Sequence, residues 1–177
     1  MNKCKILGLL LAAFIGLVGF NQHTVAARQV VTPFIPPAWY QKLPASVRFK
    51  LVLGETAVLD KETGLVWEKS PDTTLRIWSD AVYYAYNKNV GGRGGWRLPT
   101  VEELRSLVDP TQSNPALPSG HPFINVQSDY YWSSTTSVST TSSAWDVSFG
   151  NGGVDFGVKS NDYYVWCVRG GHGYDAL

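Results

Sequence analysis

The chain has little cysteine, and this excludes most sites that depend on thiols. Of its 177 residues only Cys4 and Cys167 are cysteines, and Cys4 lies in a leader that we expect to be removed. The mature chain then holds one thiol, so it can form neither an internal disulfide nor a cysteine zinc cluster. Cys167 stands between Trp166 and Val168 in an apolar segment. It is predicted to be a small core residue, with a nucleophile as the alternative.

Catalytic and metal-binding motifs are also scarce. The three histidines show no His-x-x-x-His spacing, and the chain has no Gly-x-Ser-x-Gly elbow. Asp146, Asp155 and Asp162 could supply oxygen ligands for calcium, although isolated Asp residues near turns are usually turn formers. A pair of carboxylates for glycoside hydrolysis would meet only in the fold. We therefore expect a protein that is not an enzyme and has no resident cofactor, with calcium as an open alternative.

Charge is sparse and nearly balanced. Charged residues make up 16% of the chain, and the formal net charge is +1. Loss of Lys3 and Lys5 with the leader changes this charge to about −1. Because no broad basic surface results, we expect no nucleic-acid partner.

The chain has one long apolar run, from Ile6 to Phe20. Lys3 and Lys5 precede it and Val25-Ala26-Ala27 follows it, which is the three-part pattern of a secretory signal peptide cleaved after Ala27. The run is shorter than the roughly 20 residues needed to span a bilayer. We expect a signal peptide over residues 1–27 and a mature protein without a membrane span. This protein would be exported to the periplasm, cell surface or extracellular space.

The remaining chain divides by composition. Residues 28–47 are rich in proline and aperiodic, which predicts an extended N-terminal arm. Residues 48–171 are predicted to form one domain, followed by a C-terminal tail at 172–177. Alternating polar and apolar side chains predict strands over residues 48–53, 57–59, 65–68, 130–134, 145–149, 154–158 and 163–169. Loops are predicted at residues 71–74 and 111–126 and in the Ser/Thr-rich segment 133–143.

Two helices are predicted from spacing and capping signals. Apolar residues recur on one helical face from Trp78 to Ala85, with a cap expected at Ser79 or in the Thr pair before it. Thr100 and Glu103 have the spacing of a capping box, so a second helix begins there. The stretch over residues 91–100, which starts with four glycines around Arg93, is predicted to be a structural corner. The alternative is a ligand-contacting loop, with Arg93 at its tip as the contact.

Five ordered segments carry a resemblance to a known family. They are Ala57–Glu68, Trp78–Tyr84, Gly95–Thr100 with Glu103 and Leu104, Tyr131–Ser134, and Cys167–Gly170. Together they resemble the Lcl C-terminal domain family, over roughly residues 48–171. This resemblance implies an α+β, C-type-lectin-like fold, in which two helices pack on a twisted, mostly antiparallel sheet with long loops. It also indicates the fold-defining residues Gly64, Trp67, Trp78, Gly95, Trp96, Arg97, Leu98, Pro99, Trp132 and Arg169.

The family is named for a collagen-like adhesin whose C-terminal domain binds sulfated polysaccharides and supports adhesion and biofilm formation. The resemblance therefore implies a binding module for a polysaccharide or glycan, sulfated chains included. A structural or protein-interaction domain of the cell envelope is the alternative. Turn and outward strand positions predict the ligand contacts Arg93, Trp145, Asp146, Asp155 and Lys159. Two features depart from the family: Tyr84 stands where a helix cysteine is common, and the collagen-like repeats are absent.

Overall fold

The computed structural model describes residues 43–170. The predicted signal peptide, the tail at 172–177 and residues 28–42 of the arm lie outside the described residues. The last residues assigned to the arm are helical, because α1 spans Ala45–Arg48. The other helices are α2 (Trp78–Tyr86) and α3 (Val101–Arg105). Among residues 43–170, no helix is both long and apolar enough to cross a membrane.

The first sheet has four strands in the order β1-β2-β3-β9 and is antiparallel throughout. Its strands are β1 (Phe49–Val52), β2 (Ala57–Asp60), β3 (Leu65–Glu68) and β9 (Val168–Gly170). The hairpin predicted over residues 57–68 is confirmed, and Gly64 adopts a φ of 72° at its turn. Arg48, predicted to begin a half-buried strand, instead ends α1 and is 1% exposed. Its guanidinium donates to both carboxylate oxygens of Asp60, at 2.8 and 2.6 Å, so the buried charge is paired.

The second sheet has five strands in the order β4-β8-β5-β6-β7, and only the β5–β8 pair is parallel. Its strands are β4 (Asp72–Arg76), β5 (Tyr130–Thr136), β6 (Ser143–Ser148), β7 (Val154–Val158) and β8 (Tyr163–Val165). The hairpin of β6 and β7 is confirmed. Three expectations are wrong: residues 72–74 are strand rather than loop, the Ser/Thr-rich loop shrinks to 137–142, and the final strand divides into β8 and β9.

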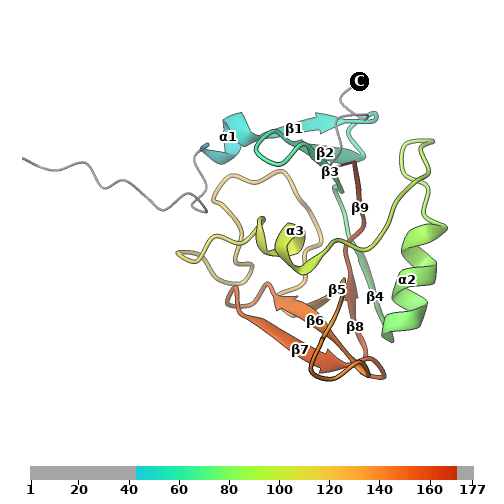
Figure 1. The fold of residues 1–177 in the computed structure, drawn as a ribbon. Coiled ribbons are helices and arrows are strands. Elements are labelled where there is room, and N and C mark those ends of the chain that lie inside the picture. Colours follow the sequence, from blue (N-terminus) through green and yellow to red (C-terminus); the bar gives the residue numbers. More distant parts are fainter. Residues whose placement is uncertain (1–42, 171–177) are drawn as a thin grey trace, which may run out of the picture. The chain divides into compact units, whose positions relative to one another are not determined.

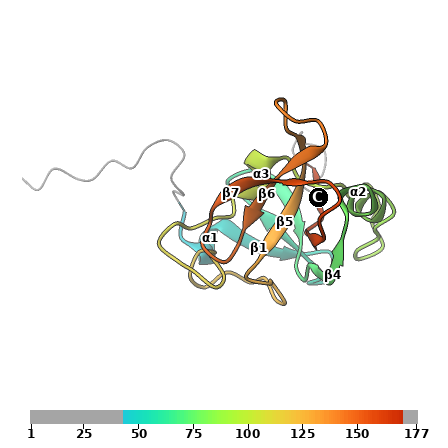
Figure 2. The same ribbon diagram turned by 90° about the horizontal axis from the view of Figure 1, so that it is seen from below.

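Two apolar clusters lie on opposite faces of the strands. Trp67, Tyr131 and Trp166 belong to the cluster that includes Leu104 of α3. Their sequence neighbours Val66, Trp132 and Val165 belong to the cluster that includes Ala81 and Ala85 of α2. Because side chains alternate along a strand, central strands with both faces covered are apolar on both sides. Figure 1 shows α2 and α3 on opposite sides of the strands, and Figures 1 and 2 both place α2 away from α1. The predicted α+β architecture is thus confirmed, with two sheets in place of one.

Candidate ligand-binding surfaces

The five predicted contact residues do not form one site. Asp146 and Asp155 are direct neighbours across β6 and β7. Trp145 points to the opposite face of the sheet, where it is half-buried and contacts Phe156 edge-on at 5.6 Å. Lys159 donates to Thr136 Oγ1 at 2.9 Å and lies 4.2 Å from the centre of the Trp78 ring. Arg93 is exposed in a turn beyond α2, closed by the Val90–Arg93 bridge.

The prediction that Asp146 points outward is wrong. Its side chain is 1% exposed, and its Oδ1 atom has no hydrogen-bond partner among the described residues. Burial, followed by the neighbouring charge of Asp155, raises the pKa of Asp146 to about 7, and the N–H of Gly157 partly opposes this shift. Asp146 is therefore too buried to contact a ligand at the surface, and its charged form is disfavoured. Asp155 alone of the two is exposed.

A metal site has little support in this part of the molecule. Within residues 43–170, no group of three or more His, Cys, Asp or Glu side chains is placed to hold an ion. Calcium requires six to eight oxygen ligands, and the Asp146–Asp155 pair offers carboxylates from two residues only.

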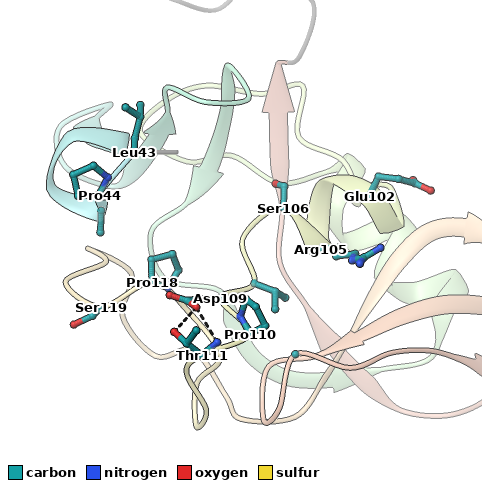
Figure 3. Close-up of a pocket in the computed structure, with 13 residues that line it drawn as sticks. Leu43, Pro44, Glu102, Arg105, Ser106, Asp109, Pro110, Thr111, Pro118 and Ser119 are labelled. Carbon is teal, nitrogen blue, oxygen red and sulfur yellow. Dashed lines mark hydrogen bonds between the residues drawn. The ribbon is translucent and has the colours of Figure 1, made fainter. Parts of the chain in front are cut away.

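One cavity lies between the start of α1, the exposed side of α3 and the loop after it. Its volume is about 840 Å³ and its walls include Pro44, Pro110 and Pro118 (Figure 3). The carboxylate of Asp109, on its wall, already accepts from the N–H and hydroxyl of Thr111 at 2.9 and 2.7 Å. The lining also includes Glu102 and Arg105 of α3 and the hydroxyls of Ser106 and Ser119, so the cavity combines apolar contact with charged and polar groups.

A shallower hollow of about 570 Å³ lies along α2, and its chemistry differs. It is lined by Arg76, Asp80, Tyr83, Tyr84, Asn87, Lys88 and Asn89. Tyr83 and the adjacent Tyr86 are the most exposed aromatic side chains among the described residues, at 73% and 79%. Aromatic faces, amides and a carboxylate therefore converge at one surface. The aromatic faces can stack on the apolar faces of ligand rings, and the amides and the carboxylate can form hydrogen bonds with ligand hydroxyls.

The sequence spacing explains how α2 presents these groups. Ala81 and Ala85 are fully buried, so their small side chains bring the helix close to the strands. Tyr83 and Tyr86 are three residues apart and turn away from that buried face. Sequence reasoning missed them because it chose contact residues from turns and strands, not from helices. A helical wheel with two tyrosines opposite the alanine stripe is the signal that could have found them.

The two cations of the hollow are held by ion pairs. Arg76 contacts Asp72 at 2.5 Å, and Lys88 contacts Glu68 at 2.6 Å and donates to the Tyr84 hydroxyl. Burial opposes the charge on Lys88, but the bonds to Glu68 and Tyr84 outweigh it and raise the pKa of Lys88. Burial also disfavours the charge on Glu68, and for a carboxyl this raises the pKa. The charges of Arg76 and Lys88 are thus balanced by neighbouring carboxylates, and the two side chains act chiefly as hydrogen-bond donors.

Comparison with known proteins adds the family. The model of the Lcl C-terminal domain matches residues 56–169. The chain belongs to this family. The match begins one residue before β2 and ends in β9, so both α2 and the corner before α3 lie inside it. A comparison with curated proteins finds no match.

The corner of this Lcl C-terminal domain, residues 91–100, is held by internal contacts. Gly91 has a φ of 58°, and a Cβ there would lie 2.7 Å from Leu53 Cβ. Trp96 is 1% exposed and its indole N–H donates to the Arg93 carbonyl at 2.7 Å. Arg97 donates to both carboxylate oxygens of Glu103 at 2.7 Å. The corner therefore joins the strands to α3, and of its side chains Arg93 faces solvent.

Two further features of the Lcl C-terminal domain concern residues singled out from sequence. Cys167 is fully buried, and burial raises the pKa of its thiol, so the thiolate nucleophile is disfavoured. Tyr84, which replaces the helix cysteine of the resemblance, lies under the Arg76 guanidinium, 3.9 Å from its ring centre. Tyr84 thus forms part of the lining of the α2 hollow.

Proposed function

We propose that this chain is an exported, non-enzymatic module that binds a polysaccharide or glycan through the surface of α2. The observation that carries the proposal is the exposure of Tyr83 and Tyr86 beside a hollow lined with polar groups. Exposed aromatic rings of this size contact water at a cost, and they are common where proteins recognise ligands. The periplasm, cell surface or extracellular space is its proposed location, in line with the N-terminal signal pattern.

The family resemblance supports the same proposal at the level of the fold. Two helices on opposite sides of largely antiparallel sheets, with the irregular segment 111–126, are compatible with a C-type-lectin-like arrangement, and we propose that arrangement here. Fold alone does not determine function, so the argument depends on the α2 surface.

The charges of the hollow favour a neutral saccharide unit over a densely sulfated one. A sulfate group would compete with Asp72 for Arg76 and with Glu68 for Lys88. Arg93, exposed beyond the end of α2, is the remaining candidate for contact with an acidic group. Binding to neutral chains should therefore persist at high salt, whereas a contribution from Arg93 should be screened.

The test is a set of neutral and heparin-like polysaccharides, presented with and without calcium. We expect the double variant Tyr83→Ala/Tyr86→Ala to lower affinity at least tenfold, about 1.4 kcal/mol or more. Both side chains are largely exposed, so folding should change by no more than about 0.5 kcal/mol. Tyr130→Ala, an exposed tyrosine on β5 that stacks on Tyr163, is the control and should bind normally.

Two results would count against the proposal. Loss of binding in Tyr130→Ala but not in the double variant would move the site to the sheet face. Absence of any polysaccharide binding, with a specific envelope protein retained through Tyr83 and Tyr86, would favour the alternative of a protein-interaction domain. Tyrosine is also enriched in protein interfaces, which is why that alternative uses the same surface.

A further inference from the structure

The outer edge of the five-stranded sheet carries an apolar strip on β7. β7 is the last strand in the sheet order, and Figure 1 shows it along the lower margin of the domain. Val154, Phe156 and Val158 alternate along it and are 38%, 47% and 51% exposed. We call these three residues the β7 strip. Natural edge strands usually carry lysine, proline or a covering segment against unwanted pairing, but β7 contains neither lysine nor proline.

We propose that β7 pairs with β7 of a second copy of this chain, antiparallel and about a two-fold axis at Phe156. The Phe156 N–H donates to Asp155 Oδ1 at 2.8 Å, so it points away from β6. In an antiparallel strand the N–H and C=O of one residue point to the same side. The two copies of Phe156 can therefore exchange a pair of backbone hydrogen bonds once the carboxylates move aside.

This register is self-complementary in its side chains. Phe156 opposes Phe156 of the second copy, and Val154 opposes Val158 of the second copy. On the other face, Asp155 opposes Gly157 of the second copy, so no carboxylate directly faces another. Trp145, 5.6 Å from Phe156, extends the aromatic row inward in each copy. Cross-strand aromatic and β-branched pairs of this kind stabilise a sheet.

The neighbouring two-fold registers are less favourable. An axis at Asp155 would set two carboxylates directly opposite each other, which is destabilising. An axis at Gly157 would extend the pairing to Lys159, which lies beyond β7. Lys159 would then have to leave its contacts with the Trp78 ring and Thr136. The axis at Phe156 uses all five residues of β7, keeps the two Asp155 carboxylates from facing each other and leaves Lys159 in place.

The expected dimer is weak. Three part-exposed side chains fall well short of the roughly 800 Å² per partner found in stable interfaces. Pairing also replaces the charge-assisted hydrogen bond that the Phe156 N–H donates to the Asp155 carboxylate with a neutral one, which lowers the gain in free energy. The association should therefore depend on concentration and tighten when the Asp155 carboxylate is removed. It involves β7 and not α2, so it stands whether or not the chain binds a glycan.

Disulfide trapping tests the register directly. Opposed residues of a hydrogen-bonded antiparallel pair have Cα atoms about 5.5 Å apart, within the range that a disulfide spans. Under mild oxidation Phe156→Cys should form a covalent dimer, while Val138→Cys should remain mostly monomeric. Val138 is 98% exposed in the β5–β6 loop and is thus a more accessible control. The native Cys167 is fully buried and should not contribute.

Two further variants test which residues of the two β7 strands face each other. Val154→Cys and Val158→Cys should cross-link when mixed but not when oxidised separately, because each faces the other across the axis. Cross-linking of either one alone would overturn the register. Cross-linking of Phe156→Cys no faster than Val138→Cys would overturn the proposal itself.

Sedimentation equilibrium of the unsubstituted protein gives the independent measurement. Over about 10 µM to 1 mM we expect reversible dimerisation. Phe156→Lys should raise the dissociation constant at least about tenfold, and Asp155→Ala should lower it. Val158→Lys repeats the first test at a second position, and thermal unfolding verifies that each variant is folded. A monomer at every concentration, or a dimer unaffected by both lysine variants, would contradict the pairing.

Discussion

Asp146 combines almost complete burial with a partly titrated charge. Its Oδ1 atom has no hydrogen-bond partner among the described residues, and Asp155 lies opposite it on β7. A buried carboxylate without full hydrogen bonding costs free energy in its charged form. The protein can lower this cost by holding the proton, which is the meaning of the raised pKa.

The pH dependence of stability follows from this group. Asp146 has a pKa of about 7 in the folded protein and an ordinary value of 3.8 in the unfolded chain. The folded state thus binds more protons between these values, so stability falls as pH rises from about 4 to about 7. Asp146→Asn removes the charge, and we expect it to stabilise the protein by about 1–3 kcal/mol at pH 8.

Urea unfolding at pH 4 and pH 8 measures this effect. At pH 4 the unsubstituted carboxyl is already protonated when folded, so Asp146→Asn should change stability little. Asp162→Asn, on an exposed residue of the β7–β8 loop, is the matched control and should change stability by no more than about 0.5 kcal/mol at either pH. An equal effect of Asp146→Asn at both pH values would rule out titration as its cause.

The wrong prediction that Asp146 is exposed has a physical origin. Alternation of polar and apolar residues predicts strands. To infer from it which side chains are exposed, one must assume that one face of the strand contacts solvent. Here the strands have apolar clusters on both faces. A polar residue on such a strand is buried and needs a partner. Asp60 on β2 finds one in Arg48, at the end of α1, whereas the Oδ1 atom of Asp146 on β6 has none among the described residues. The partner lies elsewhere in the fold, so neither outcome is readable locally.

At the scale of elements, α3 depends on its first turn. The Thr100 hydroxyl accepts from the Glu103 N–H at 3.2 Å, and the Glu103 carboxylate accepts from the Thr100 N–H at 2.8 Å, so the predicted capping box is confirmed. The helix spans only five residues. Its stability therefore comes from the cap and from packing rather than from helix propensity.

Removal of the cap should destabilise the domain. Thr100→Ala loses one capping bond, and we expect a loss of about 1 kcal/mol in unfolding free energy. Glu103→Ala loses the cap and the pair with Arg97 together, so it should cost more than Thr100→Ala. Thermal or urea unfolding measures both values.

Ser79→Ala is the control for this prediction. The sequence predicted a cap for α2 at Ser79 or in the preceding Thr pair, but α2 begins after Ile77 without a side-chain cap. Ser79→Ala should thus lie within about 0.5 kcal/mol of the unsubstituted protein. A cost equal to that of Thr100→Ala would contradict the capping argument.

The elements divide into those set by local signals and those set by tertiary contact. The hairpins of residues 57–68 and 145–158 and the start of α3 carry turn or capping signals and were predictable. β4 was not, because residues 72–76 form a strand by pairing with β8, ninety residues later in the chain. The split of residues 163–169 is similar: β8 and β9 pair in different sheets, but the sequence is continuously apolar or aromatic from Tyr163 to Val168.

At the scale of the molecule, the ordered motifs predicted the family correctly, although no single motif is specific. They predicted the binding surface less well, because the strand and turn positions chosen from sequence are spread over separate parts of the domain. Tyr83 and Tyr86 lie opposite the helix face that was predicted to be buried, and the structure shows the exposure of both side chains. Exposure of a large aromatic side chain depends on which helical face is covered, and that is a property of the assembled sheets.

Dimerisation through β7 and binding through α2 together predict an avidity effect. A disulfide-linked Phe156→Cys dimer carries two α2 surfaces on one particle. On a dense polysaccharide coat its apparent affinity should exceed that of the same protein in reductant by more than about tenfold, because the second binding event is intramolecular. Towards a short soluble oligosaccharide the two forms should bind equally per chain.

The reductant serves as a matched control because Cys167 is buried in both forms. Adding Tyr83→Ala/Tyr86→Ala to the linked dimer should abolish the gain if α2 is the binding surface. A gain that survives this double variant would place the glycan site elsewhere. No gain, with binding of the short oligosaccharide intact, would mean that the two α2 surfaces of the dimer cannot engage one coat together. The β7 pairing would then still stand on its cross-linking, and the geometry of the linked pair would limit its function to one surface at a time.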